Sequence, residues 1–115
     1  MYEMRPWLLV GGYVETREPA LLAARGVGAM LQLAEPVLQP GIASLYLAVD
    51  DGAPIPASAL RDGLAFVRAA RGAGQTVLVA CGAGVSRSVA FAAAALTDAG
   101  LATRLAAPLW EVARA

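Results

Sequence analysis

The segment Val77-Leu-Val-Ala-Cys81-Gly-Ala-Gly-Val-Ser-Arg87-Ser88-Val-Ala-Phe-Ala is an apolar run that stops at a cysteine and resumes as an alanine-rich helical pattern. The apolar run has the length of a buried strand, and the alanines that follow favour a helix. We therefore predict a strand over 76–80, a tight loop over 81–87 and a helix over 88–99, whose N-terminus faces the loop.

The loop has the composition of an anion-binding site. Gly82 and Gly84 let the backbone curl, so that successive N–H groups point toward one centre. The helix that follows adds unpaired first-turn amides and the positive end of its dipole. Arg87 supplies a planar, two-pronged donor that matches two phosphate oxygens. The pattern predicts binding of a phosphate or sulfate dianion.

Cys81 lies at the edge of this site. A helix N-terminus and a neighbouring arginine stabilise negative charge, which favours the thiolate form, and a thiolate is a nucleophile. A cysteine at a strand end is otherwise an ordinary small core residue. The two glycines, the arginine and the helix start favour the nucleophile, and together they predict a phosphomonoester hydrolase that forms a phosphocysteine.

These residues resemble the Cys-x5-Arg-Ser/Thr signature of the cysteine-dependent protein tyrosine phosphatases, and Ala-Gly-Val-Ser-Arg-Ser is closest to the dual-specificity branch. The resemblance implies that Cys81 is the nucleophile, that Arg87 binds phosphate and that Ser88 helps the thiolate leave. It covers about residues 7 to 100 and lacks the family's final helix, which implies a minimal version of bacterial or archaeal type. The phosphate-binding loop residues implied by it, besides Arg87, are Gly82, Ala83, Gly84, Val85 and Ser86.

The chain departs from the family at position 80. The family usually has histidine before the cysteine, whereas this chain has Ala80 and no histidine at all. The departure motivates an alternative hypothesis, a phosphate-binding phosphatase-like module with little or no turnover. A third hypothesis is an arsenate reductase or sulfurtransferase. Arsenate reduction usually needs a second thiol, and Cys81 is the single cysteine.

Phosphate transfer also needs an acid that protonates the leaving oxygen. Asp50 and Asp51 follow a predicted strand over 43–49. In the family the general acid lies in this loop, and counting from the strand places Asp51 on it, with Asp50 as the second choice. The alternative is that both aspartates are ordinary turn formers before Gly52.

The remaining pattern alternates strands with helices. This order predicts an α/β fold with a mainly parallel sheet of four to five strands flanked by helices, in which ligands bind beyond the carboxyl ends of the strands. We expect 1–5 to be a lead-in and 105–114 to be helical, kinked or started by Pro108. The other predicted strands are 7–10 and 27–33, and the other predicted helices run from Thr16 or Glu18 to Arg25 and from Ser58, its cap, to Arg71.

Length and charge narrow the function. A chain of 115 residues suits one compact domain over 1–115, and nine acidic residues balance nine basic ones, so we expect neither nucleic acid nor a membrane as partner. A single cysteine excludes an internal disulfide and fits a reducing cytoplasm. The expected substrates are phosphorylated proteins, phosphotyrosine first, or small phosphomonoesters, and no metal or organic cofactor is implied.

Several further residues have two interpretations. Gln32 either orients the phosphate loop or is a surface amide. Glu35 is expected to be a solvated charge, and Arg61, Arg68 and Arg71 a solvated helix flank. The aromatic residues expected to be core or packing residues, and not to stack on a ligand, are Trp7, Tyr46 and Trp110.

Overall fold

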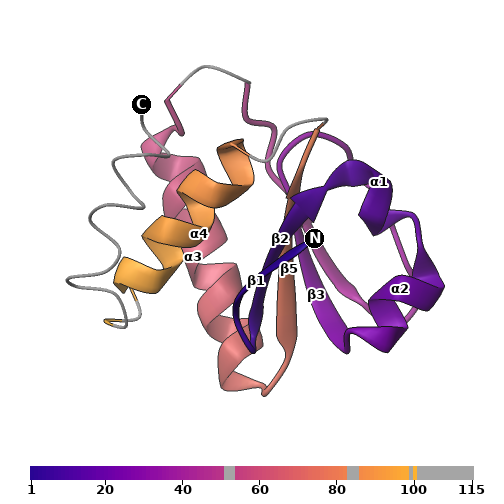
Figure 1. The fold of residues 1–115 in the computed structure, drawn as a ribbon. Coiled ribbons are helices and arrows are strands. Elements are labelled where there is room, and N and C mark those ends of the chain that lie inside the picture. The colour runs from indigo at the N-terminus through magenta and orange to yellow at the C-terminus, as the bar shows by residue number, and fades with distance from the viewer. Residues whose placement is uncertain (51–53, 83–85, 99, 101–115) are drawn as a thin grey trace.

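A computed structural model of the chain describes residues 1–50, 54–82, 86–98 and 100 (Figure 1). The predictions for the tail over 105–114 and for Trp110 lie outside them.

The described residues form one sheet with the strand order β1-β2-β5-β3-β4. Strands β2, β5, β3 and β4 are parallel neighbours, and β1 pairs antiparallel with β2 at one edge. The prediction of a mainly parallel sheet of four to five strands is confirmed. The strands are β1 (Tyr2–Arg5), β2 (Leu8–Gly12), β3 (Val27–Gln32), β4 (Ala43–Tyr46) and β5 (Thr76–Cys81).

Helices cover both faces of the sheet. Figure 1 shows α3 and α4 together on one face and α1 and α2 on the other. Within the described parts of the chain, no helix is long and apolar enough to cross a bilayer. The helices are α1 (Tyr13–Thr16), α2 (Pro19–Ala24), α3 (Ala57–Gly72) and α4 (Ser86–Asp98).

The central strand β5 is buried on both faces because its side chains alternate between two apolar clusters. Val77, Val79 and Cys81 pack in the cluster covered by α3 and α4, which includes Phe91. Leu78 and Ala80 pack on the opposite face with Leu9, Leu22 and Met30. A strand buried on both sides is a continuous apolar run, which is the signal that its sequence shows.

In the first half of the chain, one prediction was wrong and one short helix was missed. Residues 1–5 are not a lead-in, because β1 hydrogen-bonds to β2. The helix predicted from Thr16 or Glu18 to Arg25 is α2, with Glu18 as its N-cap and Arg25 as its C-cap, so the later of the two predicted starts is correct. The short helix α1, which ends at Arg17, was not predicted. A proline lacks the N–H that a helix interior requires, so it starts α2 and cannot continue α1.

Two helix starts also differ from the prediction. Pro56, and not Ser58, is the N-cap of α3, and no side chain caps that helix. Helix α4 begins at Ser86, two residues before the predicted start, so Arg87 belongs to its first turn. The strand predicted over 43–49 ends at Tyr46, although backbone bonds from Leu47 and Val49 continue along β3.

Some packing predictions fail and others hold. Tyr46 is 42% exposed and is not a core residue, whereas Trp7 is partly buried against the core. The Arg71 guanidinium lies 4.5 Å from the centre of the Trp7 ring, so Arg71 is not simply solvated. Arg68 pairs with Asp98 at 2.7 Å, while Arg61 stays on an exposed surface. Glu35 is exposed, as predicted.

Close contact between α3 and α4 depends on Gly63. A Cβ atom at Gly63 would overlap the Phe91 ring, where Cε1 lies 2.9 Å away. Phe91 is fully buried in the cluster that also holds Cys81, so the ring has little room to move.

We predict that Gly63→Ala destabilises the protein. Alanine favours a helix over glycine by about 1 kcal/mol, but overpacking a core costs about 1–3 kcal/mol. Gly72→Ala is the matched control, because nothing lies within 4 Å of a Cβ atom at that exposed position of the same helix. Urea unfolding of both variants measures the difference. Equal stability of the two would contradict the role assigned to the Gly63–Phe91 contact.

Candidate active site

Three parallel strands end side by side at one edge of the sheet. Gly12 at the end of β2 is in register with Cys81 at the end of β5, and Gln32 at the end of β3 is in register with Ala80. The Cys81 side chain is 1% exposed, and it forms no disulfide. The predicted nucleophile therefore lies in the middle of the carboxyl edge, where open parallel sheets bind ligands.

Arg87 connects two segments that are far apart in the sequence. Its Nη1 donates to the backbone oxygen of Val49 at 2.6 Å. Its Nη2 would lie 3.0 Å from a Cβ atom at Gly82, so the guanidinium passes close over the start of the predicted phosphate loop. A larger residue at position 82 would crowd that guanidinium, which gives Gly82 a steric reason to be glycine.

The segment that leads to the predicted general acid is anchored at Val49. The Val49 side chain is 4% exposed in the α3–α4 cluster, and its N–H donates to the Leu33 backbone oxygen at 3.2 Å. Asp50 follows directly and is exposed. Asp51 lies outside the described residues. The anchored backbone ends one residue before the two candidate acids.

Ser88 bonds to a residue 77 positions away in the sequence. Its hydroxyl is fully buried and donates to the backbone oxygen of Gly11 at 3.2 Å. This contact ties the first turn of α4 to β2, next to the strand that ends at Cys81. Of the other predicted loop residues, Ala83, Gly84 and Val85 lie outside the described residues, and Ser86 is described only as the first residue of α4.

Glu15 is a residue that the sequence prediction missed. Its Oε1 accepts the backbone N–H of Gly12 at 2.9 Å, and its Oε2 lies 2.8 Å from the α-ammonium of Met1. Glu15 lies three residues after the N-cap Gly12, which is the spacing of a capping box. This spacing is the sequence signal that could have identified Glu15. Burial raises the pKa of Glu15, but its bonds to the ammonium and to Gly12 outweigh burial and hold that pKa below its usual value.

Ala80 and Gln32 face away from Cys81. Ala80 is 1% exposed in the cluster on the α1–α2 side, so the position that differs from the family's histidine lies across the sheet from the thiol. Gln32 is buried and is not a surface amide, because it donates to the Val37 backbone oxygen at 2.6 Å and accepts the Val37 N–H at 2.7 Å. Gln32 thus closes the turn after β3.

Other features of the described chain lie apart from this edge. A cavity of about 490 Å³ opens between α3 and α4 at the opposite end of the sheet, and Trp7, Arg71 and Gly72 line it. None of the predicted site residues lines it. Among the residues that the structure describes, no group of three or more histidine, cysteine or acidic side chains could hold a metal ion.

Proteins named as dual specificity phosphatases are similar to this chain in sequence and in structure. No family model matches the sequence. The chain is 40% identical over 95 residues to mouse dual specificity protein phosphatase 12, covering 76% of this chain and 28% of that protein. It is 38% identical over 104 residues to the human protein of that name, covering 84% and 31%. The chain therefore spans less than a third of these relatives.

The relation to one solved structure extends over nearly the whole chain. The crystal structure of human DUSP28 superposes with a TM-score of 0.80 at 31% identity, and the match covers 96% of this chain and 80% of that one.

We predict that Glu15 makes the stability of the protein sensitive to acid. Because the folded pKa of Glu15 lies below its usual 4.5, its stabilising contribution is present above pH 4.5 and is lost as the pH falls through the folded pKa. The free energy of unfolding should therefore fall more steeply between about pH 5 and pH 3 in the native chain than in Glu15→Gln. Urea unfolding across that range measures both slopes, and identical slopes would refute the assignment.

Proposed function

The chain belongs to the dual-specificity branch of the cysteine-dependent protein tyrosine phosphatases, and from this membership we propose that it hydrolyses phosphomonoesters through a phosphocysteine on Cys81. The observation that supports the proposal most directly is the placement of Arg87. Its guanidinium lies between the Val49 backbone oxygen and Gly82, beside the strand end that bears the chain's single thiol.

In the first step the Cys81 thiolate attacks phosphorus in line with the leaving oxygen. A sulfur–phosphorus bond forms as the phosphorus–oxygen bond breaks, and Asp51 gives its proton to the departing oxygen. Arg87 and the backbone amides of 82–86 hold the equatorial oxygens, on which charge develops in the transition state. Because a phosphate and a guanidinium match in geometry, Arg87 can bind two of these oxygens at once.

In the second step water hydrolyses the phosphocysteine. Asp51, now a carboxylate, takes a proton from the water as its oxygen attacks phosphorus, and the sulfur leaves as a thiolate. We assign the Ser88 hydroxyl to assisting this departure. The hydroxyl lies in the first turn of α4, next to Arg87 in the sequence. Its single hydrogen is donated to the Gly11 oxygen, so assisting the sulfur requires the O–H to turn from Gly11 to the thiolate. The scheme uses no metal and no organic cofactor.

For the substrate we propose phosphorylated proteins, with phosphotyrosine first, over small phosphomonoesters. The names of the relatives support a protein substrate, since they are dual specificity protein phosphatases. We further propose that the protein acts in a reducing cytoplasm, where its one cysteine would remain a thiol.

A second candidate function is phosphate binding with little or no turnover. The observation that favours it is Ala80, whose buried methyl group, on the opposite face of the sheet from the thiol, can neither donate a hydrogen bond nor carry charge. Such a module would keep the anion site of Arg87 and the loop amides but would leave the thiol a weak nucleophile.

We predict that the chain hydrolyses para-nitrophenyl phosphate without added metal and that Cys81→Ser abolishes this hydrolysis. Removing the nucleophile removes the covalent step, while the anion site stays in place. The assay should run from mildly acid to neutral pH, with tungstate binding by calorimetry as the control for folding. Tungstate binding by a native chain that shows no turnover would reject the hydrolase and favour the binding module.

We predict that the loss caused by Asp51→Asn depends on the leaving group. Phenyl phosphate, whose phenolate leaves poorly, should lose about 10²–10⁴-fold in kcat, because the acid that protonates it is gone. Para-nitrophenyl phosphate should lose much less, since its leaving group is a stable anion. Asp50→Asn is the matched control and should affect both substrates little; the opposite pattern would transfer the acid role to Asp50.

A further inference from the structure

The dipeptide Gly11–Gly12 contacts several parts of the candidate site. Gly12 is in register with Cys81, and a Cβ atom at Gly12 would lie 3.0 Å from the backbone oxygen of Gly82. The Gly11 backbone oxygen accepts a hydrogen bond from the hydroxyl of Ser88, in the first turn of α4. The strand end, the loop start and the helix start thus all meet this dipeptide, so a shift of its backbone would move all three.

Two consecutive glycines do not hold a backbone by themselves, because glycine has the widest conformational freedom. Pairing with β5 holds the dipeptide along one side, and Glu15 adds a further constraint at the Gly12 N–H. Its Oε1 accepts the Gly12 N–H at 2.9 Å and would lie 2.8 Å from a Cβ atom at Gly11. The carboxylate therefore packs against the Gly11 backbone, in the space that the Cβ atom of any other residue would occupy.

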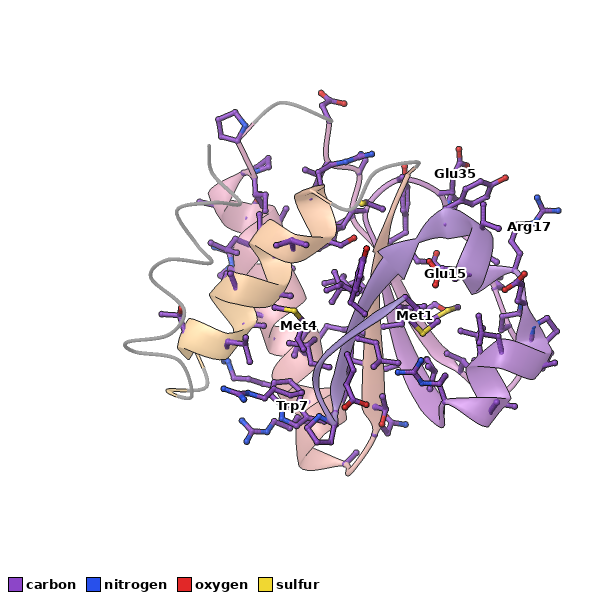
Figure 2. The ribbon with its side chains drawn as sticks, viewed as in Figure 1. Met1, Met4, Trp7, Glu15, Arg17 and Glu35 are labelled. Atoms are coloured by element: carbon purple, nitrogen blue, oxygen red, sulfur yellow. The ribbon has the colours of Figure 1, made fainter. Side chains whose placement is uncertain are left out.

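The carboxylate is itself held in place. Its other oxygen pairs with the Met1 α-ammonium at 2.8 Å, and Figure 2 shows Glu15 and Met1 side by side next to the sheet. Ala80, the neighbour of Gly11 across the β2–β5 register, contributes only a methyl group on this face. Two side chains therefore bond the backbone of the dipeptide: Ser88 at the Gly11 oxygen and Glu15 at the Gly12 N–H.

We propose that Glu15 is a positioning residue for the phosphate site, acting through its hydrogen bond to Gly12; the inference rests on the proposed function. Glu15 touches no reacting atom. By fixing Gly12 it fixes the surface that Gly82 packs on, and hence the direction in which the loop leaves Cys81. Catalytic and binding groups must be held within fractions of an ångström, so loss of this bond weakens oxyanion binding.

The test compares Glu15→Ala with Glu15→Gln in tungstate affinity, measured by calorimetry at a temperature where circular dichroism shows each variant folded. Alanine loses the bond to Gly12, and tungstate affinity should fall about five- to tenfold. Glutamine keeps an oxygen that accepts the Gly12 N–H, so its affinity should stay within about twofold of the native value. Glu3→Ala, which removes an exposed acid from the neighbouring strand β1, is the control and should bind as the native chain does.

A merely structural role for Glu15 as a helix cap would lower the melting temperature of Glu15→Ala but leave its tungstate affinity native, and this result would overturn the proposal. Equal losses in the alanine and glutamine variants would also overturn it, because the carboxylate charge and not the Gly12 bond would then matter. The binding assay needs no turnover. A native chain that binds tungstate but hydrolyses nothing would refute the phosphatase and leave the Glu15 comparison decisive.

Discussion

The parallel register of β2, β5 and β3 is the constraint on which the rest of the site depends. It places Gly12 beside Cys81 and Gln32 beside Ala80, so three segments must leave the sheet at one edge. Burial of β5 on both faces fixes that register, since a slip of one residue would carry the thiol to the α1–α2 side. The core, and not the loop after it, therefore sets the position of Cys81.

The strongly patterned elements could be predicted from the sequence because each contains its own signal. Strand β5 is a continuous apolar run, and α3 has apolar residues at three- and four-residue steps, such as Leu60, Leu64 and Val67. Each pattern can be recognised within its own segment, because it reflects which side chains of that segment are buried. Strand β1 has no such signal: Tyr2 and Glu3 are exposed, and its structure depends on pairing with β2. Pro19, by contrast, gives a local signal: because it lacks an N–H, it begins α2 and cannot continue α1.

The candidate site likewise contains contacts that the local sequence predicts and contacts that depend on residues far apart in the chain. The proximity of Gly82 to Arg87 follows from the short spacing within the loop and could be predicted. The bond from Arg87 to Val49 joins residues 38 positions apart, and that from Ser88 to Gly11 joins residues 77 apart. No local pattern contains such pairs, because they exist only after the sheet has formed.

The bond from Arg87 to the Val49 oxygen shows why arginine suits this position better than lysine. A guanidinium has five N–H donors in a fixed plane, so it can bond Val49 along one edge and present others to a phosphate. Lysine offers a single compact charge that would have to move from one partner to the other. Because Val49 directly precedes Asp50, one planar guanidinium can contact both the anion site and the segment leading to the acid. Arg87 therefore links the phosphate-binding loop to the segment that bears the candidate acids.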